Sequence, residues 1–168
     1  MPIATLNAAF STQQEWEEAA RGMSNLVDVK ILPAMEIYRF ATAANLHTWY
    51  AASWWFGRSA YDALVQSASS SRESLSGVAR RCLAVPEEWS SMDVLIAVRV
   101  LQPLSAWSGT PRTQRLKDDG GHYASRMEPD RSITQLYIPG LDPRKSSGKC
   151  VAWAKAFAGR PRVLPRIS

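Results

Sequence analysis

Asp93-Val-Leu-Ile-Ala-Val-Arg-Val-Leu101 is the stretch of this sequence that decides the fold. Its residues are almost all apolar and many are β-branched, which is typical of a strand that is buried on both faces. Pro103 follows and ends or bends the strand, because proline has no N–H to donate to a sheet. The sequence therefore predicts a buried strand over residues 93–101.

Two further segments outward from this strand also have strand patterns. Met35-Glu-Ile-Tyr-Arg-Phe40 alternates apolar residues around Glu36 and Arg39, and predicts a strand with Arg39 on one face. Ile133-Thr-Gln-Leu-Tyr-Ile138 predicts another, which Pro139-Gly140 ends.

Helices are predicted where a capping residue precedes a helical apolar pattern. The first runs from Ser11 or Thr12 to about Met23. Two others are predicted over residues 60–69, behind a capping Ser59, and over residues 75–83. Residues 108–132 contain three glycines and few large apolar groups, which predicts a long loop, and residues 151–158 predict a last short helix or strand.

The composition is that of a globular protein, with 46% hydrophobic and 21% charged residues in a chain of 168. We expect one mixed α and β domain over residues 1–168, with an N-terminal helical segment (1–25) and a basic C-terminal segment (144–168). Seven tryptophans are unusual at this length, and we expect some of them to line a cleft.

A formal charge of +5 favours anionic partners such as nucleic acid, a nucleotide or an acidic protein. Seven basic residues and no acid lie from Arg144 to the end, a run that predicts either a solvated tail or a surface for a partner. With two cysteines, no signal-peptide pattern and no long apolar run, we expect a cytoplasmic protein with free thiols and no membrane association. Delivery into a target cell without a signal peptide is compatible with this expectation.

Common catalytic motifs do not fit the chain. Gly148-Lys149 lacks the first glycine and the Ser or Thr of a phosphate loop. His47 and His122 have no neighbours at ligand spacing, so we expect no metal. The two histidines are instead candidates for the acid and base of a basic ribonuclease-type toxin.

Three segments, taken in order, resemble the ADP-ribosyltransferase fold of bacterial toxins and effectors. They are Tyr38-Arg39-Phe40, Trp49-Tyr-Ala-Ala-Ser53-Trp-Trp55 ahead of a helix, and Ile133-Thr-Gln135-Leu-Tyr-Ile-Pro139. The resemblance implies an α+β fold of two packed sheets with peripheral helices. It also implies that Arg39, Ser53 and Gln135 hold the catalytic positions.

The same resemblance implies that NAD is the substrate. Arg39 or Arg58 would bind its pyrophosphate, since guanidinium groups make bidentate contacts with phosphate. Aromatic rings would bind the nicotinamide, and the candidates are Tyr38, Trp49, Tyr50, Trp54, Trp55 and Tyr61.

Gln135 departs from the family, which has a glutamate at this position. A neutral amide binds a ribose hydroxyl but supplies no negative charge to a developing oxocarbenium ion. The acids best placed in the sequence to replace the glutamate are Glu36, Glu128 and Asp130.

The resemblance thus implies an ADP-ribosyltransferase or NAD glycohydrolase that acts as a bacterial toxin or effector. Its partners would be a macromolecular ADP-ribose acceptor, either protein or nucleic acid, and an acidic antitoxin or immunity protein. Two alternatives stay open: the ribonuclease-type toxin, and a non-catalytic module that binds nucleic acid or protein through the basic C-terminal segment.

Overall fold

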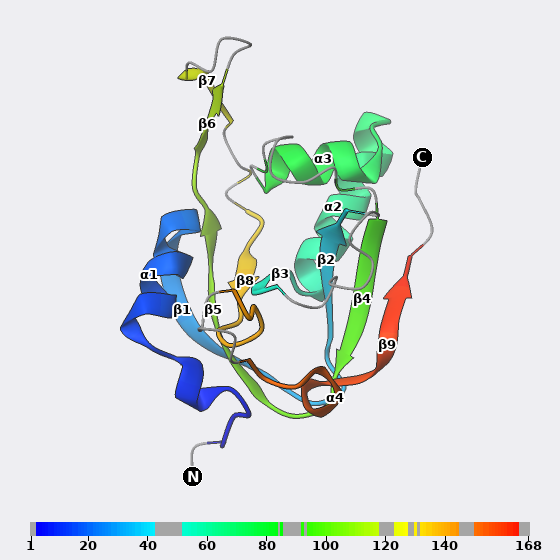
Figure 1. The fold of residues 1–168 in the computed structure, drawn as a ribbon. Coiled ribbons are helices and arrows are strands. Elements are labelled where there is room, and N and C mark those ends of the chain that lie inside the picture. The colour runs from blue at the N-terminus through cyan, green and yellow to red at the C-terminus, as the bar shows by residue number, and fades with distance from the viewer. Residues whose placement is uncertain are drawn as a thin grey trace.

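The computed structural model describes residues 3–42, 52–83, 85, 92, 94–117, 123–127, 130, 132–144 and 150–164, and only the backbone of 115–117, 123–127 and 159–161. Figure 1 shows the fold, and its elements in chain order are η1 (Ala8–Phe10), α1 (Gln13–Gly22), β1 (Met23–Ile31), β2 (Glu36–Ala41), β3 (Trp54–Trp55), α2 (Arg58–Ser71), α3 (Leu75–Cys82), β4 (Val94–Val100), β5 (Leu104–Pro111), β6 (Gln114–Lys117), β7 (Tyr123–Met127), β8 (Gln135–Tyr137), α4 (Trp153–Ala156) and β9 (Phe157–Val163).

Two antiparallel sheets make up most of the strand structure. One has the order β1-β5-β8-β3 and the other the order β2-β4-β9, while β6 and β7 form a separate two-stranded ribbon. The two larger sheets meet at one bridge, where Tyr38 of β2 and Phe56 exchange backbone hydrogen bonds of 2.8 Å. The α+β class with two sheets and peripheral helices is confirmed.

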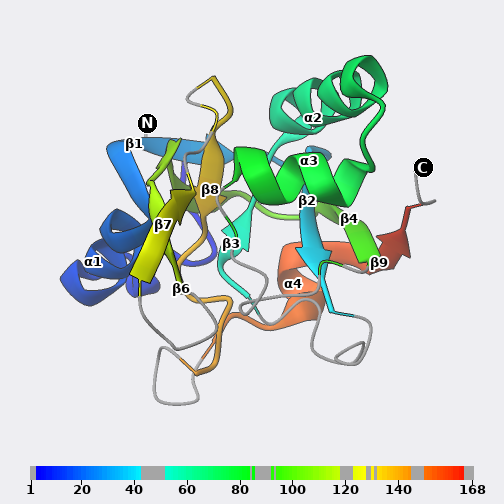
Figure 2. The ribbon, with the colours of Figure 1, turned by 90° about the horizontal axis from the view of Figure 1, so that it is seen from above.

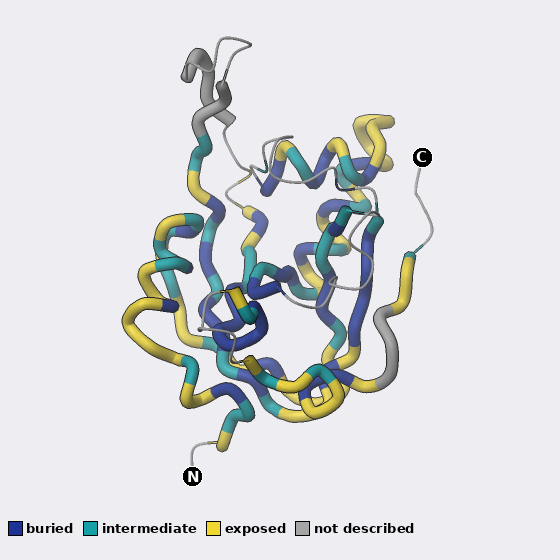
Figure 3. The backbone as a smooth tube through the Cα atoms, in the orientation of Figure 1, coloured by how far each residue is buried: buried dark blue, intermediate teal, exposed yellow. Residues whose placement is uncertain are grey.

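The strand β4 separates the two main parts of the core, as its apolar sequence predicts. Leu95 and Ala97 pack on the side of α2 and α3, in a cluster with Leu64 and Val78. The alternate residues of β4, of which Ile96 is fully buried, point into the second cluster around Trp55 and Phe157. Figure 3 shows this buried core running along the strands, with exposed residues concentrated on the helices and turns.

The helices pack on faces of the sheets: α1 on Trp107 and Tyr137, and α2 and α3 on Leu95 and Ala97. Seen from above, α1 lies on one side of β8 and β3, and α2 and α3 lie on the other (Figure 2). The side chain of Thr12 caps α1 by accepting a hydrogen bond from the N–H of Glu15. Ser74 caps α3 in the same way. The expectation that Ser59 caps α2 is wrong, because the helix begins at Arg58 after Gly57 and Ser59 lies inside it.

The expected loop over residues 108–132 is also wrong. Residues 104–111 form β5, which pairs with both β1 and β8, and residues 114–117 pair with 123–127 as β6 and β7. The small residues that favoured the prediction of a loop instead allow close packing of two strands. A β-carbon at Gly109 would lie 2.8 Å from the carbonyl oxygen of Ser24, so glycine lets β1 approach β5.

Residues 151–158 were expected to form a short helix or a strand, and the chain there forms a helix followed by a strand. The short helix α4 leads into β9, which pairs with β4. Phe157 is 1% exposed and Arg162 forms an ion pair with Glu36, so the segment down to Val163 is part of the sheet and is not a solvated tail.

The strand expected over residues 133–138 is shorter than predicted, because β8 covers only Gln135–Tyr137.

Candidate functional site

A pocket of about 450 Å³ opens beside the bridge that joins the two sheets. Tyr38 and Phe56 hold β2 and β3 together at that bridge, and no ladder continues from it among the described residues. The side chains next to the bridge therefore border an open space. We call this the inter-sheet pocket, and it is lined by Glu18, Arg21, Gly22, Arg39, Phe40, Trp54, Trp55, Phe56, Leu83, Val85, Met92, Gln114 and Gln135.

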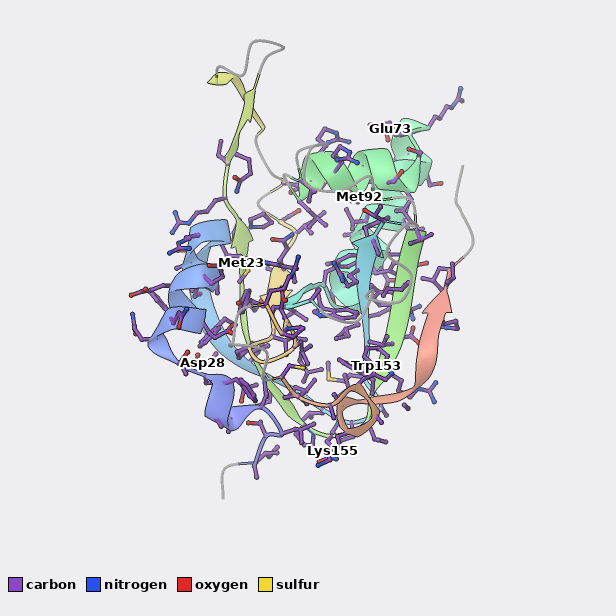
Figure 4. The ribbon with its side chains drawn as sticks, in the orientation of Figure 1. Met23, Asp28, Glu73, Met92, Trp153 and Lys155 are labelled. Carbon is purple, nitrogen blue, oxygen red and sulfur yellow. The ribbon has the colours of Figure 1, made fainter. Side chains whose placement is uncertain are left out.

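The residues that line the pocket come from segments far apart in the sequence. Figure 4 labels Met92, which lines the pocket beneath α3, and Met23, which follows the lining residue Gly22 at the end of α1. In this view β3 and β8 lie between the two labels. The volume and the mixed apolar and polar lining are within the range of small-molecule sites.

Arg39 supplies a positive charge to this pocket from a half-buried position on β2. Its guanidinium carbon lies 5.7 Å from the centre of the Trp55 ring, within reach of a cation–π contact. Burial lowers the pKa of Arg39 to about 10, with the charge of Asp142 acting in the opposite direction. The group is still cationic at neutral pH, and its incomplete solvation favours an anionic ligand.

Two tryptophans from β3 border the pocket, Trp54 half-buried and Trp55 almost completely buried. Trp55 is 1% exposed, and its indole N–H donates to the carbonyl oxygen of Ala52 at 2.9 Å. Trp54 packs edge-on against Tyr137 with ring centres 5.0 Å apart. Gly22 at the end of α1 makes room for Trp54, because a β-carbon there would lie 2.5 Å from its ring. The expectation that some tryptophans line a cleft is confirmed for these two.

Gln135 lines the pocket from β8, on the strand that lies between β5 and β3. The structure therefore brings Arg39, Trp54, Trp55 and Gln135 together, although they come from three different strands. Ser53 is not among the lining residues. It is 3% exposed and lies near the Tyr137 hydroxyl, whose pKa is raised by burial and by Glu15 and lowered by Ser53.

A second group of the predicted residues lies away from the pocket lining. The ring of Tyr38 stacks on that of Tyr61 at 4.4 Å, and its hydroxyl donates to Glu36 at 2.6 Å. Arg58 contacts the same hydroxyl at 3.3 Å and pairs with Asp62. Tyr38, Arg58 and Tyr61 thus form a separate cluster. None of the three lines the inter-sheet pocket, where they were predicted to bind NAD.

Two of the three acids named as replacements for the missing glutamate, Glu36 and Asp130, do not line the pocket either. Glu36 is bonded to Tyr38 and to Arg162, and Asp130 accepts from Ser132 at an exposed turn. The third acid, Glu128, lies outside the described residues, and so do Trp49, Tyr50, His47 and His122. The ribonuclease hypothesis therefore stays a prediction.

Sequence patterns alone did not single out the carboxylate that does line the pocket. It belongs to Glu18 on α1, one helical turn after the buried Glu15. The helical spacing of residues 13–22 could have pointed to Glu18, because it places Glu15, Glu18 and Gly22 on one face of the helix. Nothing in the sequence shows that this face meets β8.

The described residues contain no cluster of three or more potential metal ligands. Among the same residues, no helix combines the length and apolarity needed to cross a membrane. A second cavity of about 620 Å³ lies under the N-terminal segment, between Thr5, Trp16 and Lys30, and none of the predicted site residues lines it.

No protein-family model matches this sequence, and no curated protein matches it either. Among solved structures, the chain is similar to Rhs1-CT, solved in complex with its cognate immunity protein RhsI1, with 12% identity, a TM-score of 0.47 and coverage of 91% of this chain and 96% of that one. It is also similar to Tne2, solved in complex with Tni2, with 11% identity, a TM-score of 0.43 and coverage of 86% and 98%. Neither similarity assigns an activity to this chain.

Proposed function

We propose that the inter-sheet pocket binds NAD and that the protein cleaves the bond between nicotinamide and ribose. The observation that carries the proposal is that Arg39, Trp54, Trp55 and Gln135 line one pocket although they come from three strands. They supply a guanidinium group, two indole rings and a carboxamide. A dinucleotide needs these chemical groups for its pyrophosphate, its flat nicotinamide ring and its ribose hydroxyls.

The ADP-ribosyl group released in this reaction has two possible destinations, water or a macromolecular acceptor. Transfer to an acceptor makes the protein an ADP-ribosyltransferase, and transfer to water makes it an NAD glycohydrolase. The proposed setting is that of a bacterial toxin or effector, which rests on the resemblance of the three sequence segments. A formal charge of +5 is complementary to an acidic immunity protein as a partner.

Nicotinamide release from NAD by the purified protein tests this proposal, with two arginine variants compared side by side. Arg39→Lys keeps the charge and removes the planar fork, and we expect the affinity for NAD to fall about 10- to 100-fold, as for loss of a charged hydrogen bond. Arg58→Ala is the matched control, because Arg58 is exposed and does not line the pocket. We expect it to retain wild-type affinity and turnover.

The wild-type protein should release nicotinamide, and labelled NAD should show whether ADP-ribose becomes attached to protein or nucleic acid. If the wild type neither binds NAD nor releases nicotinamide, the proposed function is wrong. If Arg58→Ala loses activity and Arg39→Lys does not, the reaction takes place at a different site from the inter-sheet pocket.

A further inference from the structure

Helix α1 presents one continuous face to the sheet and to the pocket. Glu15 and Ala19 on this face are buried, and the Tyr137 hydroxyl of β8 donates a hydrogen bond to the Glu15 carboxylate. Glu18 and Gly22, spaced three and seven residues after Glu15, line the inter-sheet pocket. The buried bond between α1 and β8 therefore sets the position of the helical turn that carries Glu18.

Glu18 is the one carboxylate among the described residues that line the pocket. The remaining polar lining consists of Arg21, Arg39, Gln114 and Gln135, which are cationic or neutral. The charge of Glu18 also acts on Tyr137, which lies two residues after Gln135 on β8, where it contributes to raising the pKa after the larger effects of burial and of Glu15. Negative charge near Gln135 thus comes from α1 and not from the strand.

We propose that Glu18 supplies the negative charge that the reaction needs and that Gln135 does not provide. This inference rests on the proposed NAD-cleaving function and assigns it a catalytic residue. A carboxylate fixed beside a developing cation stabilises the transition state more than the ground state. Gln135 then serves to bind a ribose hydroxyl through its amide.

In the proposed step, the bond between C1′ of the ribose and the nicotinamide nitrogen breaks, and nicotinamide leaves as a neutral molecule with the electron pair. The Glu18 carboxylate stabilises the ribosyl cation that remains. When water is the acceptor, its oxygen adds to C1′ and its proton passes to the carboxylate and from there to solvent. NAD and water thereby give ADP-ribose, nicotinamide and one proton.

The ion pair between Glu18 and Arg21 does not oppose this role. Its N–O distance is 2.9 Å, but the Arg21 side chain is 75% exposed and that of Glu18 is 26% exposed. An exposed pair of this type contributes less than about 1 kcal/mol, so a bound substrate displaces Arg21 at little cost. Arg21 then remains available at the pocket as a second guanidinium for a phosphate group.

Glu18→Gln tests the inference, with Glu17→Gln as its matched control. Glu17 lies on the same helix, is exposed and does not line the pocket, and both changes remove one negative charge. We expect Glu18→Gln to lower kcat for nicotinamide release by about 100-fold, as for removal of one transition-state contact. Its affinity for carba-NAD, an analogue that resists cleavage, should change less than about 3-fold, because the charge acts mainly on the transition state.

Glu18→Ala serves as a second uncharged variant, since alanine favours a helix, and circular dichroism verifies the fold of each protein. A kcat of Glu18→Gln or Glu18→Ala equal to that of Glu17→Gln overturns the inference while wild-type cleavage still supports the proposed function. Equal loss of carba-NAD binding and of kcat also overturns it, because Glu18 would then act in binding alone. A wild-type protein that neither binds carba-NAD nor cleaves NAD overturns the proposed function itself.

Discussion

Gly22, at the end of α1, lies against the Trp54 ring of β3. A β-carbon at this position would lie 2.5 Å from Cη2 of Trp54, a distance that the backbone and the ring cannot accommodate without a shift. The glycine is needed for space and not for a left-handed backbone. It therefore controls where the Trp54 ring lies in the pocket lining.

We expect Gly22→Ala to displace the Trp54 ring and to lower kcat/KM for nicotinamide release about 10-fold, because overpacking of a close contact costs about 1 to 3 kcal/mol. Gly57→Ala is the control, since a β-carbon there would meet no heavy atom within 4 Å. Steady-state kinetics of both variants test the expectation. Unchanged kinetics in Gly22→Ala would show that Trp54 is not a wall of the substrate site.

Arg39 shows how one residue combines structure and function. Burial lowers its pKa to about 10, which means that the fold pays a solvation cost to keep this guanidinium group on β2. Part of the cost is offset by the Trp55 ring at 5.7 Å and by the charge of Asp142. A cation held in this way gains from an anionic ligand that restores the lost solvation.

At the scale of elements, β9 shows that the end of the described chain belongs to the core. Its first residue, Phe157, is 1% exposed and lies near the rings of Trp55 and Trp153, with ring centres 5.8 Å and 4.4 Å away. β9 pairs with β4, the strand that separates the two parts of the core. Pairing with a buried strand makes this basic segment part of the sheet.

We expect Phe157→Ala to lower the free energy of unfolding by about 3 to 5 kcal/mol, the usual cost of truncating a buried phenylalanine. Val163→Ala, in the same strand, should change it by less than about 0.5 kcal/mol because Val163 is 51% exposed. Urea unfolding followed by tryptophan fluorescence measures both. Similar values for the two variants would contradict the assignment of Phe157 to the core.

α1 is the element that links the fold to the proposed chemistry. It is joined to β8 by the bond between Glu15 and Tyr137, and the Arg112 guanidinium donates to the carbonyl oxygens of Ala20 and Met23 at the end of the helix. α1 is thus held in its first turn by Tyr137 and at its C-terminal end by Arg112. A helix fixed in this way keeps Glu18 in a defined place at the pocket.

At the scale of the whole molecule, two buried tyrosines make the fold sensitive to high pH. Burial, together with Glu36, raises the pKa of Tyr38 to about 12, and burial, together with Glu15, also raises the pKa of Tyr137. The folded state therefore holds these protons more tightly than the unfolded chain, in which tyrosine titrates near pH 10. The resulting stability is fully present below about pH 10 and is lost as the pH rises towards 12.

We expect the free energy of unfolding to fall above about pH 10, with Tyr38 contributing a loss of about 1.4 kcal/mol for each pH unit between pH 10 and pH 12. Tyr38→Phe removes the titrating hydroxyl, so its stability should fall less steeply in this range. Urea midpoints measured in steps from pH 8 to pH 11 give the two slopes. Parallel slopes for the wild type and the variant would mean that Tyr38 ionises no less readily in the folded state than in the unfolded chain.

Local patterns were sufficient to predict β4, the strand containing Arg39, the approximate extents of α1, α2 and α3, and the α+β class. These features depend on the period of apolar residues and on caps such as Thr12, which act within a few residues of the chain. The resemblance of three sequence segments also placed Arg39, Trp54, Trp55 and Gln135 in one site, and these four residues do line one pocket.

The tertiary structure alone decided which residues complete that pocket. It made a strand of residues 104–111, because a segment with serines and a glycine becomes a strand when β1 and β8 pair with it on both sides. It also placed Glu18 in the pocket, and Glu36 in a bond with Tyr38 instead. A sequence states which residue types are present, but the partners of a strand or a carboxylate come from distant parts of the chain, and only packing brings them together.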